Sequence, residues 1–114
     1  MSRKIYNKLI RDKIPQIIER EKGKLAKTTM LNEEQFRFEL KKKVTEEAQE
    51  LLEAVSIEEI ENELADLEEL IQTIAENYGI SWEKLEQVRM KKYAERGGFI
   101  EKLFLEYVEE NPET

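Results

Sequence analysis

Apolar side chains recur every three or four positions along much of this chain, which is the period of an amphipathic helix. The pattern is clearest over residues 32–55 and 56–79, and a third stretch covers residues 81–96. A shorter helix is expected over residues 12–22, and residues 24–31 read as a loop or a short strand. The pattern therefore predicts an all-α fold, an antiparallel bundle of four to five helices with room for one short extended segment.

Residues at the ends of these stretches support the boundaries. Asp12 can cap the first helix, and Pro15 is tolerated in its first turn because the missing N–H has no helical partner there. The tail over 99–108 is apolar but favours neither helix nor strand, and we expect 111–114 to fray. Two pairs have the spacing of a capping box, Asn32 with Gln35 and Ser56 with Glu59. Glycines fit the expected helix stops at Gly23, Gly79 and Gly97.

Size and charge narrow the possible functions. The chain has 114 residues, which predicts one domain over 1–114 whose small core would gain from oligomerisation. Its net charge of -7 argues against general nucleic-acid binding, since phosphate backbones need a basic surface. There is no apolar run of membrane-spanning length and no signal-peptide core, so we expect a cytoplasmic protein.

The absence of two residue types limits the chemistry further. Without cysteine there is no disulfide, thiolate metal site or cysteine nucleophile. Without histidine, the usual general base and the usual transition-metal ligand are also missing. Any metal site must therefore use carboxylates, which favours Mg²⁺, with Mn²⁺ as the other option.

Acidic residues three positions apart lie against the apolar stripe of both central helices. Glu47 falls inside the stripe of 32–55 and Glu50 on its edge, while Glu46 points away. In the second helix, Glu63 falls inside the stripe and Asp66 on the same relative edge. The connection between the helices is short, so they should be antiparallel neighbours whose acidic pairs meet at one height. Four unpaired carboxylates there would repel each other, and one or two Mg²⁺ ions would relieve this.

The competing interpretation is a solvated acidic face. The chain holds 26 Asp and Glu residues, so an EExxE string can arise by chance. Two inward-placed pairs at matched heights favour the metal site over this alternative.

Several motifs together resemble one enzyme superfamily. The string EExxE at 46–50 is followed after twelve residues by ExxD at 63–66, with NKLIRDKIP at 7–15 and RGGF at 96–99. In these motifs the chain resembles the MazG-like all-α nucleoside triphosphate pyrophosphohydrolase superfamily, in particular a small single-domain subgroup related to phosphoribosyl-ATP pyrophosphohydrolase. The resemblance covers nearly the whole chain.

The resemblance implies an activity and a set of roles. Family members cleave between the α and β phosphates of a nucleotide, giving a monophosphate and pyrophosphate, and many remove non-standard nucleotides in a house-cleaning role. The metal ligands would be Glu47, Glu50, Glu63 and Asp66, the residues that the helical period also selects. Glu46 would be an accessory acid that acts with Glu47 in catalysis. Members are commonly homodimers or homotetramers with the site at a subunit interface.

Binding of phosphates beyond the metal requires cations. The candidates are a pair four residues apart on one helix, two residues near the N-terminus and one on the rim of the acidic site: Lys92 and Arg96, Arg11 and Lys13, and Lys43. Each could equally be an exposed solubilising charge. Trp82, Tyr78 or Tyr93 could stack on a base, although aromatic residues at helical spacing usually belong to the core.

Two other functions stay open from the sequence. The leading prediction is a Mg²⁺-dependent pyrophosphohydrolase acting on a non-standard nucleoside triphosphate, and the first alternative is hydrolysis of phosphoribosyl-ATP, which a substrate panel would separate from it. The other is a non-catalytic helical module that oligomerises or binds a protein partner. Thermal stabilisation by Mg²⁺ would distinguish the enzyme from the module, because a ligand of the native state raises the melting temperature.

Overall fold

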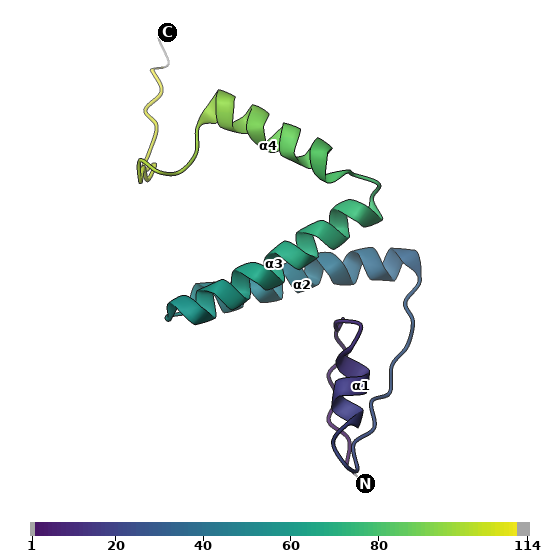
Figure 1. Ribbon diagram of the computed structural model, residues 1–114. Coiled ribbons are helices and arrows are strands. Elements are labelled where there is room, and N and C mark those ends of the chain that lie inside the picture. Colours follow the sequence, from purple (N-terminus) through teal and green to yellow (C-terminus); the bar gives the residue numbers. More distant parts are fainter. Residues whose placement is uncertain (1, 112–114) are drawn as a thin grey trace. The chain divides into compact units, whose positions relative to one another are not determined.

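The computed structural model describes residues 2–111, and within them the chain forms four helices and no strand (Figure 1). The helices are α1 (Ile14–Glu19), α2 (Glu33–Glu53), α3 (Ile57–Asn77) and α4 (Trp82–Arg96). The prediction of an all-α fold is confirmed. The chain divides into two compact units, one ending at Ile80 and one beginning at Ser81, and each is described by itself.

Helices α2 and α3 form a packed antiparallel pair (Figure 1), as their short connection predicts. Both predicted capping boxes are present. Asn32 Oδ1 accepts a hydrogen bond from the Gln35 backbone N–H at 2.9 Å, and Ser56 Oγ accepts one from the Glu59 N–H at 3.1 Å. Each box satisfies amide groups that a helix start would otherwise leave unpaired, so the sequence fixes where both long helices begin.

The seam between α2 and α3 buries only part of the predicted apolar stripes. Leu40 and Ala75 are buried in it. Four residues that the helical period places inward are exposed: Ala48, Val55, Leu64 and Ile71. The reason is geometric, because a stripe wide enough for a bundle extends beyond the narrow contact that one pair of helices makes.

A polar cluster joins the two helices at the end of the pair that lies away from their connection. Arg37 Nε donates to Asn77 Oδ1 at 2.7 Å, and Asn77 Nδ2 donates to Glu33 Oε1 at 2.6 Å. The Arg37 guanidinium also lies 4.2 Å from the centre of the Tyr78 ring. These contacts link the start of α2 to the end of α3.

Helix α1 is shorter than the predicted 12–22. It begins at Ile14 after Lys13, which provides no side-chain cap, and it ends at Glu19. Asp12 lies one position too early to cap it, so that prediction is wrong. The six residues have no side-chain cap at the start and no buried side chain, so little stabilises a longer helix through Lys22. Residues 24–31 form a loop, not a strand.

The second unit contains α4 and the segment that follows it. Ser81 Oγ caps α4 by accepting from the Lys84 backbone N–H at 3.0 Å, and Gly97 ends the helix with φ +79°. The glycine is needed there because other residues rarely adopt a positive φ. Residues 98–111 are neither helix nor strand, and the rest of the expected frayed end, 112–114, lies outside the described residues. No helix in the described part of the chain is long and apolar enough to cross a membrane.

Candidate metal and nucleotide site

Three of the four predicted metal ligands come together between α2 and α3. Glu47 and Glu50 project from α2 one turn apart, and Glu63 faces them from α3. One carboxylate oxygen from each of the three lies within 4.8 Å of the others. The helical period and the short connection between the helices thus predicted a real juxtaposition.

Two oxygens of this group are buried without a partner. Glu47 is only 7% exposed, and among the described residues 2–111 neither its Oε2 nor the Oε2 of Glu63 has a hydrogen-bond partner. A buried carboxylate oxygen without a donor costs free energy unless a cation or a proton offsets its charge. The donor set consists only of carboxylate oxygens, which suits a hard divalent cation such as Mg²⁺. The residues therefore fit the metal that the sequence predicts.

Burial also changes how these carboxyl groups titrate. It raises the pKa of Glu47 to about 7, and the nearby Glu50, Glu63 and Asp66 carboxylates add to the shift. Burial likewise raises the pKa of Glu63 above its usual range. In the metal-free protein, a proton bound by these carboxylates therefore reduces the repulsion between them near neutral pH at the lowest cost in free energy.

The fourth predicted ligand, Asp66, lies outside this group of three. Its Oδ1 accepts a hydrogen bond of 2.6 Å from Nη2 of Arg11, which comes from the segment before α1. The sequence marked both residues as site candidates but did not predict that they pair. The ion pair joins residues 55 positions apart, so no local pattern could reveal it.

Lysines pair with the rim of the acidic group. Lys43 Nζ lies 3.6 Å from Glu46 Oε2 and 3.8 Å from Glu47 Oε1. Lys8 Nζ lies 3.9 Å from Glu46 Oε1. Sequence reasoning missed Lys8, although it belongs to the same NKLIRDKIP segment as Arg11. Glu46 is therefore held at the rim between two lysines and is not part of the buried group.

Comparison with known proteins assigns the chain to a family. A sequence model described as phosphoribosyl-ATP pyrophosphohydrolase matches residues 9–92, which is well over half of the chain. The chain belongs to the phosphoribosyl-ATP pyrophosphohydrolase family. It is thereby a member of the MazG-like all-α superfamily and a nucleotide pyrophosphohydrolase by family. No curated protein and no solved structure gave a match.

The family match includes every residue of the acidic group and also Arg11. It ends at Lys92, so Arg96 and the glycines after it lie outside the matched range. Lys13 lies at the start of α1 and forms no ion pair within residues 2–111.

The remaining candidates lie in the second unit, which is described by itself, or at the end of α3. Lys92, Arg96, Trp82 and Tyr93 belong to the second unit of this phosphoribosyl-ATP pyrophosphohydrolase family member, and their roles stay predictions. Tyr78 lies at the far end of α3, where Arg37 and Lys41 lie over its ring. These contacts make Tyr78 part of the polar cluster, so its position is explained without stacking on a nucleotide base.

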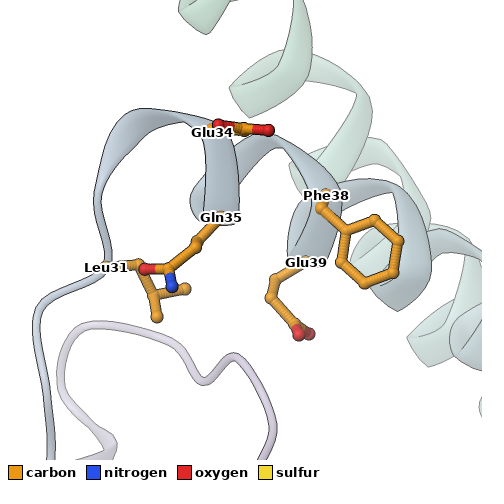
Figure 2. A pocket seen from close by; sticks show the side chains of 5 residues that line it. All are labelled: Leu31, Glu34, Gln35, Phe38 and Glu39. Carbon is orange, nitrogen blue, oxygen red and sulfur yellow. The ribbon is translucent and has the colours of Figure 1, made fainter.

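A shallow pocket lies at the start of α2, away from these carboxylates in sequence. It has a volume of about 340 Å³ and is lined by apolar and polar side chains (Figure 2): Leu31, Glu34, Gln35, Phe38 and Glu39. It holds none of the predicted site residues and no basic group that could bind a phosphate. The acidic group between α2 and α3 therefore remains the candidate site.

Proposed function

We propose that this protein is a Mg²⁺-dependent pyrophosphohydrolase that cleaves the α–β phosphoanhydride of a non-standard nucleoside triphosphate, releasing a monophosphate and pyrophosphate. The observation that carries the proposal is the buried Glu47 carboxylate, which faces Glu50 and Glu63 and has one oxygen with no hydrogen-bond partner in the described part of the chain. Family membership supports the class of reaction. The house-cleaning role and the choice of a triphosphate rest on the resemblance in the sequence motifs.

The residues that would hold the cation are those of the buried group. Glu47, Glu50 and Glu63 would supply three oxygens, and Asp66, one turn after Glu63, would supply the fourth. When bound, Mg²⁺ would offset the charge of the phosphates and make a bound water more acidic, and Mn²⁺ could substitute for it. Because the metal would activate the water, no histidine base is needed, which agrees with a chain that has no histidine.

The other side chains would act on water and phosphates. Glu46 lies beside Glu47 at the half-exposed rim, where it could accept a hydrogen bond from the attacking water and orient it. Lys43 lies within ion-pair distance of Glu46 and Glu47, so it limits the repulsion between them before the substrate arrives. Arg11, with Lys13 nearby in sequence, would contact the phosphates.

We further propose that the protein works as a homodimer or homotetramer. The support is the exposed apolar surface that α2 and α3 leave uncovered, with Leu52, Val55 and Leu64 among its residues. An exposed apolar surface of this kind is typical of a subunit interface. Burying it against a second copy would also provide the core that one packed pair of helices lacks.

Phosphoribosyl-ATP is the second candidate substrate. The observation in its favour is the description of the matching family, which names this reaction. Both substrates would be cleaved at the same kind of bond by the same residues, so the acidic group does not separate them.

The experiment is pyrophosphate release from a panel of standard nucleotides, non-standard nucleotides and phosphoribosyl-ATP, with excess Mg²⁺. We expect hydrolysis of at least one member that EDTA abolishes and that Glu63→Gln lowers by about 100-fold or more. Glu61→Gln is the matched control, because Glu61 is an exposed glutamate two residues earlier on α3. Full activity of Glu63→Gln, or hydrolysis that EDTA leaves intact, would overturn the proposal.

A further inference from the structure

Arg11 occupies the carboxylate that the metal is expected to need. Its Nη2 donates to Asp66 Oδ1 at 2.6 Å, and Asp66 is the predicted fourth ligand. The guanidinium supplies a positive charge at that oxygen, so it does there what a bound cation would do. The Arg11 guanidinium and a metal ion therefore compete for Asp66 Oδ1.

The ion pair is accessible enough to open. The Arg11 side chain is 56% exposed and that of Asp66 is 37% exposed. Ion pairs exposed to this degree contribute little to stability, since water and salt screen them. A divalent cation held by three further carboxylates can therefore displace the guanidinium at small cost.

The guanidinium has unused donors for a second partner. Of its five N–H groups, one is engaged with Asp66, and no other hydrogen bond of this side chain is formed within the described residues. A guanidinium with free donors matches the paired oxygens of a phosphate. Arg11 thus has the chemistry to bind an anion as soon as Asp66 is taken from it.

The segment that carries Arg11 can follow such a change. Residues 2–13 form no helix or strand, and Lys8 of this segment also reaches the rim, at 3.9 Å from Glu46. Residues 1–31 contain nine Lys and Arg against three Asp and Glu, whereas 32–114 contain ten against 23. The basic segment is thus attracted to the acidic helices without being locked to them.

We propose that Arg11 is an exchangeable counter-ion: it holds Asp66 in the metal-free protein and passes to a phosphate of the nucleotide when a divalent cation takes the Asp66 carboxylate. This inference rests on the proposed function. The exchange conserves ion pairing, because Asp66 pairs with the metal ion in place of the guanidinium and Arg11 pairs with a phosphate in place of Asp66. Arg11 is then both a competitor of the free metal and a ligand of the substrate.

Two affinities measured by calorimetry test this exchange, Mg²⁺ alone and Mg²⁺ with pyrophosphate, a probe that needs no base recognition. For Arg11→Gln we expect Mg²⁺ alone to bind about two- to five-fold more tightly, because its competitor is gone. Pyrophosphate in excess Mg²⁺ should bind about ten-fold more weakly, because the guanidinium contact is lost. Arg20→Gln removes an equal charge at the other end of α1 and should change neither affinity.

A conservative variant separates the exchange from a folding defect. Arg11→Lys keeps the charge but loses the planar fork, so its Mg²⁺ affinity should stay near that of the wild type while its pyrophosphate affinity falls. Weaker or unchanged Mg²⁺ binding by Arg11→Gln would overturn the exchange, since a residue that only positions Asp66 would lower both affinities. Absence of Mg²⁺ binding by the wild-type protein would overturn the proposed function as well, and it would be seen before any variant is compared.

Discussion

At the scale of single residues, the chemistry depends on the placement of Glu47. Its carboxylate is buried among other acids, and burial is the first cause of its raised pKa. The helical period and the EExxE string allowed its inward position to be predicted. The pairing of Arg11 with Asp66 could not be predicted, because it depends on how an irregular segment meets a helix 55 positions later.

The charge of Glu47 should destabilise the metal-free protein. Replacing it by Gln removes the repulsion with Glu50 and Asp66 at almost constant volume, so the melting temperature without metal should rise at pH 8. The same variant should lose metal-dependent hydrolysis by about 100-fold or more. Thermal unfolding in EDTA checks the first effect and pyrophosphate release the second. A variant that is less stable without metal would show that the negative charge of Glu47 is satisfied by the protein itself.

The raised pKa of Glu47 also predicts a pH dependence. The folded state holds its proton up to about pH 7, whereas the ordinary value is 4.5, so between these limits the folded state binds more protons than the unfolded state. The free energy of unfolding of the metal-free protein should therefore be higher at pH 5.5 than at pH 8 because of this group. Denaturant titrations at both pH values measure the difference. Glu47→Gln should reduce it, Glu61→Gln should not, and an equal difference in both variants would refute the assignment to Glu47.

At the scale of elements, the α2–α3 pair is the part of the fold that the sequence predicted best. The capping boxes are local signals, and each was found where its spacing placed it. The length of α1 and the exposure of Val55 were not predicted, because they depend on what packs against each element.

The polar cluster at the far end of the pair should stabilise it measurably. Asn77→Ala removes the side-chain hydrogen bonds of Asn77 with Arg37 and Glu33 and should lower the free energy of unfolding by about 1–2 kcal/mol. Asn62→Ala is the matched control, an exposed asparagine on the same helix, and it should change stability much less. Equal losses in the two variants, measured by denaturant titration, would show that the cluster does not stabilise the pair.

At the scale of the whole molecule, the described residues form two compact units, and the family match runs from the first into the second. One domain over 1–114 therefore stays a prediction. The small size of the chain predicted that oligomerisation would add to its core, but the sequence could not identify the surface through which subunits would associate. The exposed apolar residues of α2 and α3 now provide a candidate surface.

The proposed oligomer can be tested by placing a charge on that surface. Leu64→Lys should shift the protein toward the monomer in sedimentation velocity, because a lysine buried in an apolar interface loses its hydration without a partner. Glu61→Lys adds positive charge to an exposed polar position of the same helix and should leave the oligomer intact. A wild-type protein that sediments as a monomer at all concentrations would contradict the proposal.

The most direct test of the central claim is binding of Mn²⁺ to the nucleotide-free protein, followed by the loss of the free-ion EPR signal at pH 8. The acidic group should bind Mn²⁺ saturably, Mg²⁺ should displace it, and Glu61→Gln should bind as the wild type does. Glu63→Gln should weaken binding by about 10-fold or more, because it replaces one ligand of the group by a neutral side chain. Equal binding by Glu63→Gln and the wild type, or no saturable binding by either, would contradict the account.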